Sequence, residues 1–201
     1  MLVYDFAVKT RPPVPSSRVQ RRRERTRAAL LAVGARQFAS RGVGPVSVEE
    51  LIAEADVSRA TFYALFSSKY SLLEGILDPI FEVATQRIRE LCGRPAEEAI
   101  DGLVEIYWSL WTTHRDGLKL IQLVDEATFA HFEKQHCALQ DALLDLLLGA
   151  ERADLLRNGS AQYSLKIIAR TAVQLLRVYD GHAAAAALFR DALRGLLLRA
   201  H

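Results

Sequence analysis

The sequence has few residues of the kinds that hold disulfides, metal ions or membranes. Of its 201 residues only two are cysteines, Cys92 and Cys137, and their spacing fits neither a disulfide framework nor a metal site. We therefore expect reduced thiols in a reducing compartment. Apolar stretches such as 142–148 are too short to span a bilayer, and no signal-peptide pattern opens the chain. The expectation is a cytoplasmic protein without membrane contact.

Motifs of common catalytic sites are also missing. There is no nucleophile elbow, glycine-rich phosphate loop or paired-carboxylate motif. Only His131, His136 and Cys137 lie close enough along the chain to suggest a metal site. The spacing of the two histidines places them on diverging faces of a helix, whereas helical metal pairs prefer i, i+3 or i, i+4. We expect no enzymatic activity, no metal and no cofactor.

Charge is unevenly distributed, although the net charge is only +2. Residues 1–27 hold eight Lys and Arg against two acidic residues, a net charge of +6, so the remainder carries −4. A basic end on an acidic body indicates that one end faces a polyanion. Prolines at 12, 13 and 15 disfavour regular structure at the start of this basic end.

The most informative stretch is 46–69, which reads VSVEELIAEADVSRATFYALFSSK. Its pattern predicts two short helices separated by a tight turn, followed by the start of a third helix. Serines stand where each helix should begin, at Ser47, Ser58 and Ser68, and a serine at this position accepts a hydrogen bond from a free backbone N–H. Apolar residues can close on one small core: Val48, Leu51, Ile52, Val57, Phe62 and Phe66. This is the pattern of a helix-turn-helix, whose second helix lies in the DNA major groove.

Four blocks of the sequence match one family in register. They are Phe38-Ala39-x-Arg41-Gly42, Ser47-Val48-x-x-Leu51, Ala55-x-Val57-Ser58-Arg59-x-Thr61-Phe62-Tyr63, and Phe66-x-Ser68-Lys69 with Leu72-Leu73. On these residues the segment 26–80 resembles the DNA-binding domain of TetR-family transcriptional regulators. The resemblance implies an all-α fold, with an N-terminal three-helix helix-turn-helix domain joined by a linker helix to a C-terminal helical domain for ligand binding and dimerisation.

This resemblance divides the chain into three expected parts. They are a flexible basic and proline-rich arm at 1–17, a DNA-binding domain at 18–80 with its motif at 47–66, and an effector-binding and dimerisation domain at 81–201. Four positions depart from the family pattern: Gly34 and Ile52 replace alanine, Asp56 replaces glycine and Leu65 replaces histidine. The Asp56 position needs a positive φ, which aspartate tolerates better than most residues.

Contacts with DNA are expected from the outward face of the second helix and from the basic run. Arg59 can reach a guanine edge or a phosphate, and Thr61 a thymine methyl or a phosphate. The resemblance implies that Tyr63 and Lys69 contact the DNA backbone. The full candidate set is Arg21, Arg22, Arg25, Ser47, Ser58, Arg59, Ala60, Thr61, Tyr63 and Lys69.

Hydrophobic periodicity predicts the remaining helices. We expect them at 18–40, 69–91, 95–113, 116–125, 128–148, 161–179 and 182–199, with Gly42 as a left-handed cap after the first. Pro79 lies well inside the second of these, where its ring clashes with the carbonyl four residues back. We therefore predict a kink or break between Gly75 and Pro79, at which a hinge would couple the two domains.

Aromatic residues and histidines gather where this family forms its effector pocket. Rings at helical spacing are most often ordinary core, but together these residues suggest a largely apolar pocket. The candidates are Tyr107, Trp108, Trp111, His114, Phe129, Phe132 and His136.

The last two helices carry wide apolar stripes, and the resemblance implies that this pair docks on a second copy of the chain. The candidate interface residues are Leu165, Ile168, Ala172, Leu175, Leu176, Leu188, Phe189, Leu193 and Leu196.

The sequence as a whole predicts a homodimeric repressor that binds a palindromic double-stranded DNA operator and is released by a small apolar or aromatic effector. One alternative is a DNA-binding regulator or architectural factor without an effector, which a filled interior between Tyr107 and Cys137 would favour. A further alternative is an enzyme or scaffold that has lost DNA binding.

Overall fold

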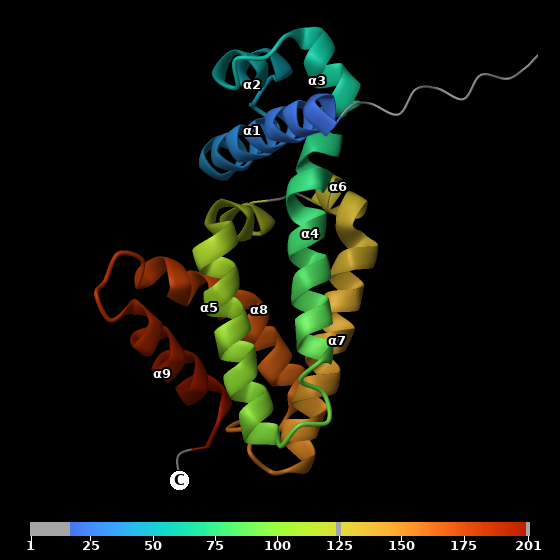
Figure 1. The fold of residues 1–201 in the computed structure, drawn as a ribbon. Helices are drawn as coiled ribbons and strands as arrows, with labels where there is room; N and C mark the ends of the chain where they lie inside the picture. Colours follow the sequence, from blue (N-terminus) through green and yellow to red (C-terminus); the bar gives the residue numbers. More distant parts are fainter. Residues whose placement is uncertain (1–16, 124–125, 200–201) are drawn as a thin grey trace, which may run out of the picture.

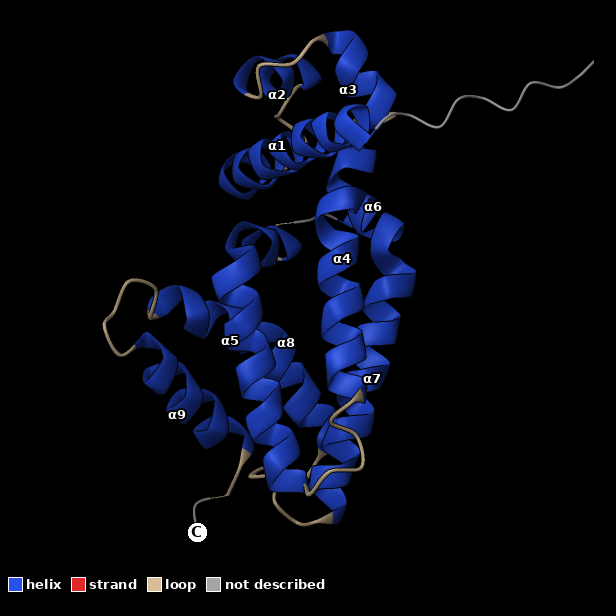
Figure 2. Ribbon diagram, viewed as in Figure 1, coloured by secondary structure: helices blue, strands red, loops and turns tan. Residues whose placement is uncertain are grey.

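The computed structural model describes residues 17–123 and 126–199, so the predicted arm lies outside the described residues except for Ser17. Apart from an isolated bridge between Leu156 and Leu198, the regular structure of this described part is helical (Figure 2). The elements are α1 Ser17–Arg41, α2 Val48–Glu54, α3 Arg59–Leu65, α4 Lys69–Arg89, α5 Ala96–Ile121, α6 Glu126–Phe129, the short 3-10 helix η1 Ala130–Phe132, α7 Glu133–Arg152, α8 Ala161–Val178 and α9 Ala185–Leu197. The expected all-α class is confirmed.

Helices α1, α2 and α3 form a small unit around the first turns of α4, and α4 continues into a larger bundle with α5, α7, α8 and α9 (Figure 1). In the bundle α4 packs on α5 and α7, α8 packs on α7, and α9 packs on α5 and α8. The last part of α5 also reaches α1, where the two units meet (Figure 1). Among the described residues, none of these helices is long and apolar enough to cross a membrane.

Serine caps begin the short helices of the N-terminal unit. Ser47, Ser58 and Ser68 each have extended backbone, and each hydroxyl accepts a hydrogen bond from a backbone N–H three residues later, at 3.2, 3.1 and 3.1 Å. These bonds satisfy donors that a helix leaves without a partner in its first turn. The three predicted caps are confirmed.

Two turns of this unit need positive φ. Gly42 ends α1 at φ +80°, and its N–H donates to the carbonyl of Phe38 at 2.8 Å. Asp56 turns the chain between α2 and α3 at φ +51°. Both conformations agree with the predictions. Aspartate is one of the few residue types other than glycine that adopt a positive φ at modest cost.

The core of the N-terminal unit is closed by Leu30, Phe38, Leu51 and Phe62, which are fully buried. Ile52, the large replacement for alanine, lies half-buried against this core. The helices therefore accommodate the extra side chain at the edge of their contact.

Helix α4 runs through Pro79 without a non-helical residue, so the predicted kink or break between Gly75 and Pro79 is wrong. Proline removes one hydrogen bond and crowds the carbonyl of residue 75, and the glycine there tolerates the crowding. Leu77 and Ile80 on either side of the proline are buried. Tertiary packing thus holds the helix across the missing bond.

The backbone departs from helical geometry in α5 instead. His114 has φ −135° and ψ 38°, which divides α5 into two helical parts. The sequence placed a boundary at 113–116, so the two predicted helices are present but joined by a kink.

Candidate DNA-binding surface and effector cavity

One face of α3 is buried and the other is open. Phe62 and Phe66 anchor the buried face, with ring centroids 6.0 Å apart. On the open face, Arg59 exposes 66% of its side chain and Tyr63 is 46% exposed. Ala60 is exposed and Thr61 half-exposed beside them. The face offers a guanidinium, a hydroxyl, a methyl and a phenol along one short helix.

The Arg59 guanidinium has only weak partners in this structure. It lies 3.1 Å from Glu49 Oε1 and 5.8 Å from the centroid of the Tyr63 ring. Exposed ion pairs of this kind contribute little, about 0–1 kcal/mol. Arg59 can therefore leave Glu49 for a phosphate or a base edge at small cost.

The basic start of α1 lies beside α3. Arg23 Nη2 donates to the carbonyl of Ala64 at 3.4 Å, and the Arg27 guanidinium lies 5.4 Å from the centroid of the Phe66 ring. The three predicted DNA-contact residues of this run, Arg21, Arg22 and Arg25, are exposed. The arginines at the start of α1 and the open face of α3 thus lie in the same N-terminal unit.

Ser47, another predicted contact, is engaged in a capping box. Glu50 Oε2 accepts from the Ser47 N–H and lies 2.8 Å from its hydroxyl, while Arg41 Nη1 lies 2.7 Å from Glu50 Oε1. The bond from the Ser47 backbone and that from Arg41 lower the pKa of the Glu50 carboxyl to about 2. The first role of Ser47 is to hold the start of α2.

Lys69 has a different environment from the one that the sequence suggested. Its ammonium donates to the carbonyls of Val43, Gly44 and Val46, at 2.9, 2.7 and 3.0 Å. These carbonyls belong to the loop between α1 and α2, and three acceptors occupy the three donors of a lysine ammonium. Lys69 therefore clamps this loop onto α4 and has no donor left for a phosphate in this conformation.

A cavity of about 120 Å³ lies between α4, α5, α7 and α8. Most of its lining is apolar and includes Ile80, Ala84, Leu110, Leu139, Leu143 and Ile168. Polar groups come from Tyr107, Gln122, His136 and Gln140. Of the predicted pocket residues, Tyr107 and His136 line this cavity. The aliphatic lining could not be predicted from the sequence, because these residues follow the same pattern as ordinary core residues.

Tyr107 and His136 are both uncharged near neutral pH. Burial raises the pKa of the Tyr107 hydroxyl and lowers the pKa of the His136 imidazole. The His136 ring lies 3.4 Å from Gln140 Nε2, whereas in the described chain no hydrogen bond reaches the Tyr107 hydroxyl. A ligand in this cavity would therefore find a donor on the half-buried Tyr107.

Three predicted pocket residues on α5 lie elsewhere. Trp111 is 1% exposed in the core, with the Arg115 guanidinium 5.5 Å from its ring centroid. Trp108 faces Phe189 of α9, with a centroid distance of 6.5 Å, and His114 is exposed at the kink. These three side chains contact other parts of the protein or face solvent. Their predicted place in the effector pocket is therefore wrong.

Phe129 and Phe132 belong to a ring cluster at the start of α7 and do not line the cavity. Phe129 makes an edge contact with His136 at a centroid distance of 4.7 Å, and Phe132 lies 6.2 Å from Phe81 of α4. Phe132 is 1% exposed. These two residues therefore pack behind His136 and do not line the predicted pocket.

The histidines and the cysteine of this region do not converge. His131 pairs with Glu74 at 3.1 Å and stacks on Tyr70, while Cys137 is exposed. Within the residues that the structure describes, no group of three or more His, Cys, Asp and Glu side chains is gathered for a metal ion.

Comparison with known proteins identifies the N-terminal unit. Residues 30–76 match the family model described as bacterial regulatory proteins, tetR family. The chain is 31% identical over 90 residues to the HTH-type transcriptional regulator EthR of Mycolicibacterium smegmatis, an alignment that covers 43% of this chain and 42% of that protein. The corresponding protein of Mycobacterium tuberculosis is 26% identical over 91 residues. The N-terminal unit of this chain is thus similar to the DNA-binding domain of the tetR family.

The TetR fold extends beyond the aligned segment. The ketosteroid transcriptional regulator KstR2 of Mycobacterium tuberculosis superposes with a TM-score of 0.73 at 18% identity, covering 93% of this chain and 98% of that one. A tetR-family regulatory protein from Rhodococcus RHA1 gives 0.70 at 16% identity, covering 88% and 98%. The matched relatives are named as regulators and not as enzymes.

The apolar stripes of α8 and α9 serve mainly the core of a single chain. Five of the nine residues predicted at a dimer interface are buried at 1% exposure or less within one chain: Ile168, Ala172, Leu176, Phe189 and Leu193. Leu165, Leu175 and Leu188 are half-buried, and Leu196 is 37% exposed. Buried side chains cannot meet a second copy, so the interface assignment of these five is wrong.

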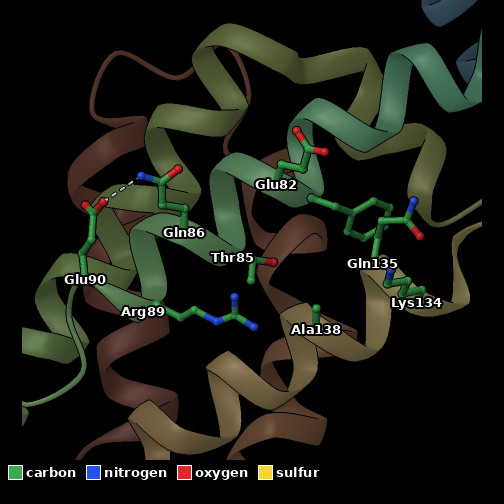
Figure 3. A pocket seen from close by; sticks show the side chains of 9 residues that line it. Glu82, Thr85, Gln86, Arg89, Glu90, Lys134, Gln135 and Ala138 are labelled. Atoms are coloured by element: carbon green, nitrogen blue, oxygen red, sulfur yellow. Dashed lines mark hydrogen bonds between the residues drawn. The ribbon is translucent and has the colours of Figure 1, made fainter.

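A second hollow, an open groove of about 700 Å³, lies between α4 and α7 (Figure 3). Its lining is more polar than that of the inner cavity and includes Glu82, Thr85, Arg89, Glu90 and Lys134. Figure 3 shows the Arg89 guanidinium turned into the space between the helices, beside Thr85 and Ala138.

Proposed function

We propose that this protein is a DNA-binding transcriptional regulator that reads its operator with α3. The observation that carries the proposal is the open face of α3, on which Arg59, Thr61 and Tyr63 stand over a buried phenylalanine anchor. A helix of this kind presents its first turns to base edges in the major groove. Arg59 supplies the base contact, and Tyr63 a backbone contact.

The exposed arginines of α1 supply sequence-independent affinity in this proposal. Arg21, Arg22 and Arg25 take part in no ion pair in the described chain and lie in the same unit as α3. Each phosphate that an arginine neutralises adds to the salt dependence of binding. We divide the protein accordingly into a basic arm at 1–17, a DNA-binding domain at 18–80 and an effector and dimerisation domain at 81–201.

A homodimer would place two copies of α3 on a palindromic operator, with half-sites about 34–36 Å apart or a multiple of this distance. We assign the interface to the outward faces of α8 and α9. Tyr163 and Val178 are 62% and 74% exposed, and lie about 60° apart around α8. Both side chains remain exposed in a single chain, so a second copy could cover them.

We infer that the protein is a repressor and that an effector in the inner cavity releases it by lowering its affinity for DNA. The apolar lining favours an apolar or aromatic molecule, and Tyr107, His136 and Gln140 are the polar groups that would orient it. Because the coupling is reciprocal, operator DNA must weaken effector binding by the same factor.

Selection of bound duplexes from a random pool, followed by fluorescence anisotropy on the selected sequence, tests the DNA part of this proposal. Arg59→Ala should lose about 1–3 kcal/mol of discrimination at its base pair. The control Arg94→Ala, at an exposed position between α4 and α5, should bind as wild type. Equal behaviour of the two variants would place the DNA interface elsewhere.

The small inner cavity also favours a second candidate, a regulator without a small effector. Typical ligand pockets measure about 300–1,000 Å³, and this cavity holds about 120 Å³. A thermal-shift screen of apolar and aromatic compounds separates the two candidates, since only an effector-binding protein gains stability with ligand concentration.

A further inference from the structure

The inner cavity and the α4–α7 groove have one lining residue in common, Phe81. Phe81 is 3% exposed, and its ring lies 6.2 Å from the Phe132 ring and 6.5 Å from the His136 ring, between centroids. One aromatic side chain therefore stands between a space of about 120 Å³ and an open groove of about 700 Å³.

Rotation of this side chain would join the two spaces. The inner cavity alone is smaller than a typical ligand pocket, and the groove alone is open to solvent along its length. Phe81 has two rotatable side-chain bonds and is held by ring contacts rather than by hydrogen bonds. A molecule that fills the inner cavity would then extend into the groove.

The groove also offers positive charge, on Arg89 of α4 and Lys134 of α7. In the part of the chain that is described, neither Arg89 nor Lys134 takes part in an ion pair. Of the two carboxylates in the lining, Glu90 accepts a hydrogen bond from Gln86 at 3.1 Å, and Glu82 lies two helical turns from Arg89 (Figure 3). The guanidinium of Arg89 is thus left facing the space between the helices.

We propose that Phe81 is the gate of the effector cavity and that the effector is an amphipathic anion. Its apolar body passes Phe81 into the inner cavity, and its carboxylate or sulfonate stays in the groove on Arg89, with Lys134 as the second cation. A guanidinium suits this role because it binds a planar or tetrahedral oxyanion through two donors. This inference rests on the proposed effector function and adds the chemical class of the ligand and its route of entry.

Two fluorescent probes with the same aromatic frame test the anion site. Anilinonaphthalene sulfonate carries the anion, and N-phenylnaphthylamine lacks it. Arg89→Gln should weaken sulfonate binding about tenfold, the effect of losing one hydrogen bond to a charged group, and leave the neutral probe unchanged. Arg87→Gln is the matched control, because Arg87 lies on the same last turn of α4 but donates to Ser109 of α5 at 3.0 Å.

Stopped-flow association of the same probes tests the gate. Phe81→Leu and Phe81→Ala should both accelerate association of the two probes, since a smaller side chain blocks the passage less. Two variants are used because Phe81→Ala removes more of a buried contact, and circular dichroism confirms that each is folded.

The outcomes separate this inference from the function on which it rests. Probe binding that falls when Ala84→Leu fills the inner cavity, combined with the Arg89 and Phe81 effects, supports the proposal. Two outcomes overturn the proposal while leaving the cavity as a ligand site, provided that Ala84→Leu still weakens probe binding. In the first, Arg89→Gln and Arg87→Gln bind the sulfonate probe equally well. In the second, the Phe81 variants associate with the probes at the wild-type rate. Probe binding that is absent, or indifferent to Ala84→Leu, overturns the effector function together with the gate.

Discussion

Lys69→Met should destabilise the DNA-reading unit and leave the salt dependence of DNA binding unchanged. The Lys69 ammonium donates to the carbonyls of Val43, Gly44 and Val46 at 2.7–3.0 Å. Methionine retains an unbranched side chain of similar length and removes all three donors. The loop between α1 and α2 would then lose its attachment to the start of α4.

The magnitude follows from these three bonds. A hydrogen bond to a charged group contributes about 1.5–3 kcal/mol, but the exposed Gly44 carbonyl can bind water instead. We therefore expect a total loss of about 2 kcal/mol, less than the sum of three such bonds. With a urea slope of about 2 kcal/mol/M, the unfolding midpoint should fall by about 1 M. Arg94→Met removes a positive charge from an exposed side chain between α4 and α5 and should change stability by less than about 0.5 kcal/mol.

Salt titration of operator binding separates the clamp from a phosphate contact. If Lys69 neutralised a phosphate, its loss would reduce the slope of log K against log salt by about 0.9. The carbonyl clamp predicts an unchanged slope together with reduced stability. A flattened slope at wild-type stability would refute this reasoning and restore the role implied by the family resemblance.

Three further predictions concern the caps, the turn and the C-terminal helices. Because the folded pKa of Glu50 is lowered from 4.5 to about 2, its stabilisation is present above pH 4.5 and is lost as the pH falls toward 2. Glu50→Gln should therefore flatten the fall in urea midpoint over this interval, and a wild-type pH profile would contradict the capping-box role. Asp56→Val should lose about 1–2 kcal/mol at φ +51°, whereas Asp56→Gly should change stability by less than about 1 kcal/mol; thermal unfolding in which valine equals wild type would contradict the strained turn. Leu193→Ala should lose about 2–5 kcal/mol as a core truncation, while Val178→Glu should leave the fold intact and dissociate the dimer in sedimentation experiments. A folded, stable but monomeric Leu193→Ala variant would restore Leu193 to the interface.

The N-terminal unit could be predicted in detail because its signals are local. The serine caps, the left-handed turn at Asp56 and the glycine after α1 each depend on a few adjacent residues, and the structure confirms them. The side chain of Lys69 could not be placed in this way, because its acceptors lie 23 to 26 residues earlier in the chain.

In the rest of the chain, contacts between residues far apart in the sequence determine the structure where local sequence patterns do not. Pro79 disfavours a continuous helix by local rules, but buried neighbours on both sides keep α4 intact. The stripe on α9 that contains Phe189 and Leu193 is equally suited to a core and to a dimer interface, and only the positions of α5 and α8 assign it to the core. For the same reason the sequence found Tyr107 and His136 but could not separate cavity-lining aliphatic residues from ordinary core.

Hydroxyl-radical footprinting on the DNA upstream of the protein's own gene tests the central claim most directly. The account predicts two symmetric protected stretches whose centres lie about one helical turn apart or a multiple of it, and their loss in Arg59→Ala. A folded protein that protects no palindromic sequence there, or one whose footprint is unchanged in Arg59→Ala, would contradict α3 as the DNA-reading helix.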